Sequence, residues 1–97
     1  TFAFYSGYLK PMVQRLNEPV SVTLFFNHQN HSIFPKTIIW HNHSYPITKL
    51  GLHHSYRLGS TLYHIFSVVS RSYFFRLKLD TSTLHWTLEE LSDGLPT

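Results

Sequence analysis

The chain has 97 residues, enough for one domain with a modest hydrophobic core. Because it contains no cysteine, its composition excludes disulfides, thiolate metal sites and a cysteine nucleophile, and 16% aromatic residues argue against intrinsic disorder. The net charge of +3 permits an acidic partner but does not require one.

The first part of the chain has no clear periodicity. The chain begins with threonine, and Met12 is its one methionine, so we expect Met12 to begin the natural domain and the eleven residues before it to be an extension. Because the strand pattern starts only at Pro19, residues 1–18 are assigned to the N-terminal extension. Residues 19–94 are then expected to form a single domain. The alternation of Phe2, Phe4 and Tyr8 leaves open the alternative that the segment contains an edge strand.

Apolar residues alternate from Pro19 onward. They predict a strand over residues 20–26, a polar turn over 27–32 and a returning strand over 33–40. The polar stretch 41–44 predicts a tight reversal that sets Trp40 opposite Tyr45. A further strand is expected before Arg57, and Arg57, Leu58 and Gly59 fit a three-residue hairpin with Gly59 in the left-handed conformation.

The stretch from Leu62 to Leu88 has the clearest pattern. Every second residue is apolar through three consecutive segments, which predicts a meander with one face toward a core and the other toward water or a partner. The predicted core face carries Leu62, His64, Phe66, Val68, Tyr73, Phe75, Leu77, Leu79, Leu84, Trp86 and Leu88. After Trp86 the pattern Thr87-Leu88-Glu89-Glu90 matches a capping box and predicts a short C-terminal helical turn.

These elements predict an all-β fold. About five to seven short strands joined by tight turns indicate a small, strongly bent antiparallel meander, or a barrel of the SH3-like or OB-like type, with the helical turn at its C-terminus. Closure of the barrel is expected, because a flat sheet of this size would leave apolar surface exposed.

The face opposite the predicted core is basic and aromatic. Cations interleaved with an exposed ring suit single-stranded nucleic acid, in which the cations contact phosphate and the ring stacks on a base. Equally, such cations keep a sheet soluble and unaggregated. The surface predicted to contact a nucleic acid or a protein partner comprises Phe74, Arg76, Lys78, Arg57, Arg71 and His85.

Histidines offer an alternative site. His28, His54 and His64 share parity with the inward residues of their strands, whereas His53 and His85 are expected to face outward. Three converging imidazoles could hold zinc with an open fourth position. The other interpretation is that they hydrogen-bond to the backbone or to tyrosine hydroxyls, in which case no cofactor is expected.

The sequence shows no pattern that is typical of a catalytic site. The five carboxylates fall mostly in turns or near the C-terminus, and there is no nucleophile elbow and no glycine-rich phosphate loop. A non-enzymatic protein is therefore expected. No apolar run reaches the length of a membrane span and no export signal is recognisable, so a cytoplasmic location and no membrane partner are expected.

Three stretches, residues 38–47, 74–77 and 84–90, resemble a family of small uncharacterised bacterial β domains. Their shared outline is a Trp, a short turn and a Tyr, here Trp40 and Tyr45, and later a hairpin ending in Trp-x-Leu and an acidic tail, here Trp86 and Leu88. The resemblance covers about residues 19–93. Some relatives occur beside accessory proteins of error-prone DNA polymerases, which implies a link to DNA repair, and the family brings no catalytic residues.

Together these observations predict a non-enzymatic interaction module whose partner is protein or nucleic acid. The alternatives are a metal-binding domain and a structural subunit of a protein assembly. The sequence leaves the oligomeric state open.

Overall fold

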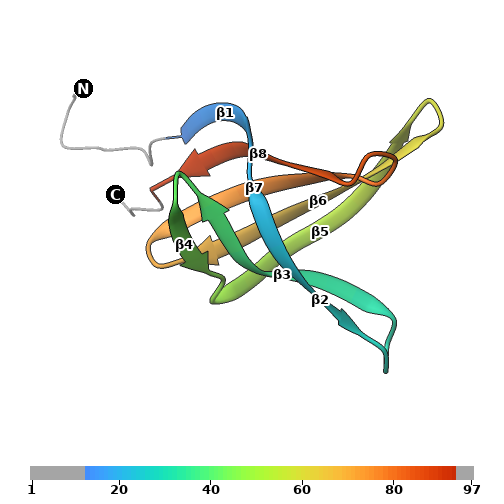
Figure 1. The fold of residues 1–97 in the computed structure, drawn as a ribbon, viewed down its shortest axis with the longest axis horizontal. Helices are drawn as coiled ribbons and strands as arrows, with labels where there is room; N and C mark the ends of the chain where they lie inside the picture. The colour runs from blue at the N-terminus through green and yellow to red at the C-terminus, as the bar shows by residue number, and fades with distance from the viewer. Residues whose placement is uncertain (1–12, 94–97) are drawn as a thin grey trace.

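The computed structural model describes residues 13–93, which form eight β-strands and no helix (Figure 1). The strands are β1 (Val13–Pro19), β2 (Ser21–Asn27), β3 (Ser32–Trp40), β4 (His43–Pro46), β5 (Lys49–Leu58), β6 (Thr61–Ser70), β7 (Tyr73–Asp80) and β8 (His85–Ser92). All ladders are antiparallel. The predicted all-β class is thus confirmed. The described residues contain no helix long and apolar enough to cross a membrane.

The strands form two sheets. Five strands lie in the order β1-β8-β7-β6-β5, and the other three lie in the order β2-β3-β4 (Figure 1). The predicted closed barrel is wrong, because no ladder joins the two sheets. The apolar faces of the sheets instead pack on each other, which buries the apolar surface between them without closure of a barrel.

The core lies between the sheets. Ile38 of β3 packs against the buried residues of β6, β7 and β8, and half-buried side chains from both sheets surround this cluster. The buried members are Ile38, Phe66, Val68, Phe75, Leu77 and Leu88. The predicted core face of β6 and β7 is therefore confirmed at Phe66, Val68, Phe75 and Leu77.

The hairpin between β7 and β8 differs from the prediction. Leu84 is 71% exposed, with φ of 64°, and its N–H donates to the carbonyl oxygen of Asp80 at 2.7 Å. Leu84 therefore closes the turn and does not enter the strand. The turn sets Leu79 opposite Trp86, so the core alternation of β8 begins at Trp86.

The predicted C-terminal helical turn is wrong, because β8 continues as a strand to Ser92. Arg76 pairs with Glu90 while Leu77 pairs with Leu88, so Glu89 is one extra residue in β8. Such a β-bulge shifts the side-chain alternation by one position. The apolar spacing from Leu88 to Leu91 thereby imitates a helical period.

The register of the β3–β4 hairpin also differs. His41 and Asn42 both have positive φ, 51° and 62°, as a two-residue type I′ turn requires. Trp40 therefore pairs with His43, and Tyr45 pairs with Ile38. The predicted pairing of Trp40 with Tyr45 is wrong by two residues, although their ring centroids lie diagonally 6.3 Å apart.

The predicted domain boundary at residues 18 and 19 falls inside β1. Residues 13–19 pair with β8 and form one edge of the five-stranded sheet. Residues 1–12, which include Phe2, Phe4 and Tyr8, and residues 94–97 lie outside the described residues.

Candidate functional site

The predicted contact surface centres on the solvent-side face of the five-stranded sheet. Phe74, Arg76 and Lys78 alternate along β7 with the buried Phe75 and Leu77, so they point away from the core. We call the side chains on this side the outer face. Its side chains include Tyr56, Tyr63, Phe74, Arg76, Lys78, His85 and Glu89, as well as Lys49, His54 and the buried Ile65.

One carboxylate holds both cations of β7. The Nε of Arg76 donates to Glu89 Oε1 at 3.0 Å, and the Nζ of Lys78 lies 3.6 Å from Glu89 Oε2. The Glu89 side chain is 19% exposed and that of Arg76 is 42% exposed. Glu89 thus fixes the two cations in position and offsets one of their two charges.

Two tyrosines extend this group across the sheet. Tyr56 of β5 and Tyr63 of β6 are paired across their ladder, with ring centroids 5.3 Å apart and an interplanar angle of 24°. The Lys78 ammonium lies 5.2 Å from the Tyr63 ring centroid, within the range of a cation–π contact. The outer face therefore presents two stacked rings beside a positioned cation.

The other predicted contact residues are distributed differently. His85 pairs with Asp80 at the start of β8 and lies on the outer face. Arg57 pairs with Leu62, whose side chain lies on the opposite side of the sheet from that of Tyr63. Arg71 donates to the carbonyl oxygen of Ser44 at 3.3 Å and lies over the Tyr45 ring. Arg57 and Arg71 are therefore not brought to the outer face.

The predicted histidine trio is not assembled. His28 lies in the turn after β2, and His54 and His64 point to opposite sides of their sheet, because His54 pairs with Ile65. Within residues 13–93 no group of three or more histidine and acidic side chains could hold a metal ion.

The partner of His64 is His53, which was predicted to face outward. His53 Nε2 lies 2.8 Å from His64 Nδ1, and the His53 ring stacks on Phe66 at 4.2 Å. A register shift between Leu50 and His53 reverses the face of each following residue, which explains the error. Burial lowers the pKa of His53, and the nearby charges of His64 and His54 lower it further.

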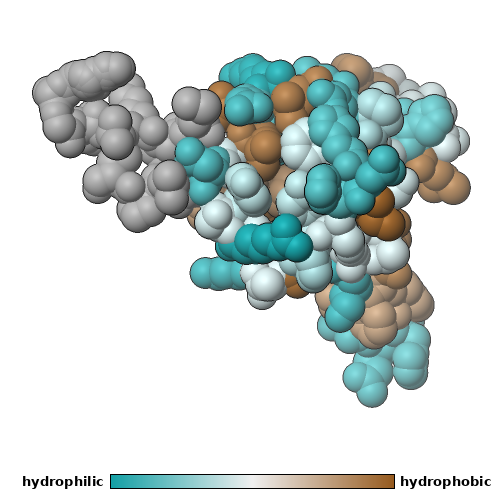
Figure 2. Space-filling view, turned by 60° about the vertical axis from the view of Figure 1, so that its left-hand side comes forward, coloured by the Kyte–Doolittle hydropathy of each residue, from teal (hydrophilic) through white to brown (hydrophobic). Residues whose placement is uncertain are grey.

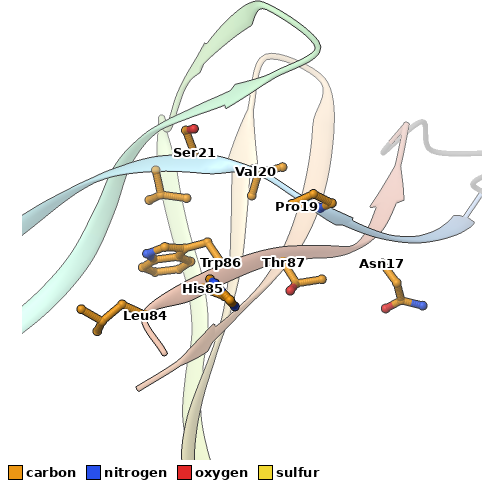
Figure 3. Close-up of a pocket in the computed structure, with 9 residues that line it drawn as sticks. Asn17, Pro19, Val20, Ser21, Leu84, His85, Trp86 and Thr87 are labelled. Atoms are coloured by element: carbon orange, nitrogen blue, oxygen red, sulfur yellow. The ribbon is translucent and has the colours of Figure 1, made fainter. Parts of the chain in front are cut away.

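An open cleft of about 530 Å³ lies where β1 runs into β2, beside the start of β8 (Figure 3). It is lined by Asn17, Pro19, Val20, Ser21, Val22, Leu84, His85, Trp86 and Thr87. His85 is the one titratable side chain in this lining, so the cleft presents no acid–base pair. The Trp86 ring projects into the space below β2 (Figure 3).

A second exposed area lies on the β2–β3 hairpin, which projects from the rest of the molecule and is apolar along its length and polar at its tip (Figure 2). Phe25 and Phe34 lie across the ladder with centroids 5.3 Å apart, and the Lys36 ammonium is 5.9 Å from each ring centroid. The aliphatic stem and charge of Lys36 thus cover these rings.

The sequence interpretation missed Tyr56, Tyr63, Glu89 and His53. The predicted three-residue turn at residues 57–59 is wrong, because Arg57 and Leu58 belong to β5 and the turn is Gly59 and Ser60. This two-residue turn, the signal for the tyrosines, pairs Leu58 with Thr61 and hence Tyr56 with Tyr63. Glu89 had no such signal, because the bulge that turns it toward Arg76 is not encoded by alternation.

Comparison with models of protein families, with curated proteins and with solved structures gave no match for this chain.

Proposed function

We propose that this protein is a non-enzymatic interaction module that binds single-stranded nucleic acid on its outer face. The observation that carries the proposal is the arrangement of Tyr56, Tyr63 and Lys78, in which two stacked rings adjoin a positioned cation. Phe74, 49% exposed on the same side, offers a further ring.

The chemistry of these groups fits an unpaired strand. Base stacking on an aromatic side chain contributes about 1–3 kcal/mol per base and tolerates any base. The Arg76 contact with Glu89 uses Nε, so its terminal guanidinium nitrogens are free of this contact and can donate to phosphate.

The charge on the outer face limits the expected affinity. Glu89 offsets one of the two charges of Arg76 and Lys78, and Glu90 lies 4.0 Å from Arg15. If two phosphates are neutralised, log K should fall with log salt with a slope of only about −1.4. Modest affinity that depends chiefly on stacking is therefore part of the proposal.

The test is fluorescence anisotropy with labelled single-stranded and double-stranded oligonucleotides. We expect the single strand to bind better, and we expect Tyr56→Ala and Tyr63→Ala each to weaken binding about fivefold or more, since a stacking contact of about 1 kcal/mol is lost. Double-stranded DNA preferred over single-stranded DNA, or no effect of either substitution, would contradict the proposal.

A matched pair of double variants tests the cations. Arg76→Gln with Lys78→Gln removes two charges from the outer face, whereas Lys36→Gln with Arg71→Gln removes two charges elsewhere. We expect the first pair to reduce binding more than the second. An equal loss in both would indicate attraction by net charge alone.

We also propose a cytoplasmic location, which the lack of cysteine supports. A zinc site is not proposed, because no three ligands lie together among the described residues.

A further inference from the structure

β5 is the most exposed strand in the described part of the chain, and one of its two edges is free. All ten of its residues are exposed, and β6 is its one neighbour in the sheet. Leu52 and Leu58 are 74% and 68% exposed, and the strand contains no proline. Such an edge presents unpaired backbone groups that readily accept another strand.

The register of the β5–β6 hairpin identifies which backbone groups are free. The two-residue turn makes Leu58 and Thr61 a hydrogen-bonded pair, and such pairs alternate with non-bonded ones along an antiparallel ladder. Tyr56 and His54 therefore bond to β6. The N–H and C=O groups of His53, Ser55 and Arg57 point away from β6 to the free edge.

The opposite edge of the sheet is different. In β1 the ladder has a register shift between Arg15 and Glu18, Asn17 has φ of 50°, and the strand ends at Pro19. Bulges, charges and proline are the features that block strand addition. β5 has a register shift of its own between Leu50 and His53, but its ladder is uninterrupted from His53 to Leu58, so within the five-stranded sheet this segment is the part of an edge best able to accept a further strand.

We propose that two copies of this chain associate through β5, antiparallel about a two-fold axis at Ser55. In this register Ser55 pairs with Ser55 of the second copy, and His53 pairs with Arg57. Each of the three resulting pairs, 53 with 57, 55 with 55 and 57 with 53, exchanges both backbone hydrogen bonds. A two-fold axis satisfies both copies with the same surface.

The side chains select this register. Pairing about Ser55 sets Leu52 of one copy opposite Leu58 of the other, twice, on the outer side of the sheet, and sets His54 opposite Tyr56. A shift by two residues in one direction sets His54 opposite His54 and Leu58 opposite Leu50, whose side chain lies on the other side of the sheet. A shift in the other direction sets Leu58 opposite His54 and Leu52 opposite the turn residue Ser60. The Ser55 register alone among these three covers both exposed leucines with each other.

The inner side of the same pairing is also compatible. Ser55 meets Ser55, two small side chains, and Arg57 meets His53, whose ring is held by His64 and Phe66. The association joins two five-stranded sheets into one continuous sheet and removes both β5 edges from solvent. It needs neither Arg76 nor Lys78, although it sets Tyr56, a ring of the proposed nucleic-acid site, beside His54 of the second copy; the centrifugation test below contains no nucleic acid and so separates the two proposals.

Sedimentation-velocity centrifugation of the full chain over a range of concentrations tests the proposal without any ligand. We expect a monomer–dimer equilibrium that Ser55→Pro shifts to monomer. The Ser55 N–H bonds to no strand within the molecule, so the fold should tolerate this proline, and circular dichroism checks it. Ser55→Ala keeps the N–H and should remain dimeric. A monomer at all concentrations, or a dimer unaffected by Ser55→Pro, would overturn the proposal.

Charge substitutions test the register itself. Leu52→Lys alone and Leu58→Glu alone should each weaken the dimer, because each leaves a charge against a leucine. The double variant should restore it, since the introduced lysine of one copy then faces the introduced glutamate of the other. A double variant no more dimeric than the single ones would contradict the Ser55 register.

Discussion

Trp40 and Glu18 form a hydrogen bond that joins the two sheets. The indole nitrogen of Trp40, at the end of β3, donates to Glu18 Oε1 on β1 at 3.0 Å. His41 Nε2 lies 3.0 Å from the same oxygen. A carboxylate that forms hydrogen bonds in its charged form holds its proton less readily, so this contact affects the response of the fold to pH.

We predict that this bond makes stability fall in acid. The indole bond lowers the pKa of Glu18, burial opposes that change, and the contact with His41 lowers it further. The unfolded chain, with a pKa near 4.5, binds the proton first, so stability is present above that value and is lost as pH falls through the lower folded pKa. Urea unfolding measured from pH 6 to about pH 3 should show a smaller loss of unfolding free energy in Glu18→Gln and in Trp40→Phe than in the wild type. Equal slopes in all three proteins would contradict the prediction.

The pair of His53 and His64 gives a second, separate pH dependence. With 2.8 Å between ring nitrogens, one ring must accept the hydrogen bond, so protonation of both opposes the contact. The folded pKa of His53 is lowered from 6.5. The unfolded state therefore takes up the proton first, and stability present above pH 6.5 is lost as pH falls toward the folded pKa.

His53→Phe should remove this dependence, because a phenyl ring can stack on Phe66 without titrating. Two-dimensional NMR of the imidazole signals should show His53 titrating below the ordinary histidine value in the wild type. A normal titration of His53 in the wild type would show that the pair does not form. The same would follow if the His53→Phe variant lost as much unfolding free energy below pH 6.5 as the wild type does.

The orientation of β8 can be tested with two leucines. Leu88 is fully buried and Leu84 is 71% exposed, although simple alternation predicts both inside. Leu88→Ala should lower the free energy of unfolding by about 2–5 kcal/mol, since it leaves a cavity in the core. Leu84→Ala should change it by less than about 0.5 kcal/mol. Chemical denaturation of the two variants measures both values, and similar losses would contradict the register.

Glu89→Gln tests whether Glu89 restrains binding. The substitution keeps the shape of the side chain but removes the charge that offsets Arg76 and Lys78. One charge at a distance of ~6 Å from phosphate contributes about 0.7 kcal/mol in a water-like dielectric, so single-strand affinity should rise about threefold at low salt. Glu18→Gln, which removes the same charge on β1, is the control. An equal gain in both variants would assign the effect to net charge.

Alternation predicted the central strands and failed where the ladder is irregular. Phe66 and Leu77 lie in uninterrupted ladder, so the period of two placed them correctly in the core. Glu89 is itself the extra residue of the bulge in β8, and His53 follows the bulge in β5. A shift of one residue moves a side chain to the other face of the sheet. The bulge in β5 has a local signal in Gly51, where a Cβ would lie 2.9 Å from the carbonyl oxygen of Ser67, whereas the bulge in β8 has no such signal and depends on the strand that lies alongside.

Turn length was the other source of error. The predicted pairing of Trp40 with Tyr45 assumed that residues 41–44 all belong to the turn, whereas His41 and Asn42 complete it alone. Leu84 adopts a positive φ that disfavours most residues other than glycine and asparagine, so propensity did not indicate it. Because the bulge at Glu89 was not predicted either, the outer face was predicted at Arg76 and Lys78 without the carboxylate that contacts them.

The ladder between β1 and β8 closes nearly the whole described chain, since Val13 pairs with Ser92, whereas every other ladder joins consecutive strands. Hairpins between consecutive strands close short loops, whereas the pairing of β1 with β8 closes a far longer loop and therefore costs more chain entropy. We expect β1 to join after the folding transition state has formed. In stopped-flow measurements, substitutions at Leu16 of β1 should then accelerate unfolding and leave the folding rate almost unchanged, whereas substitutions at Phe66 should slow folding.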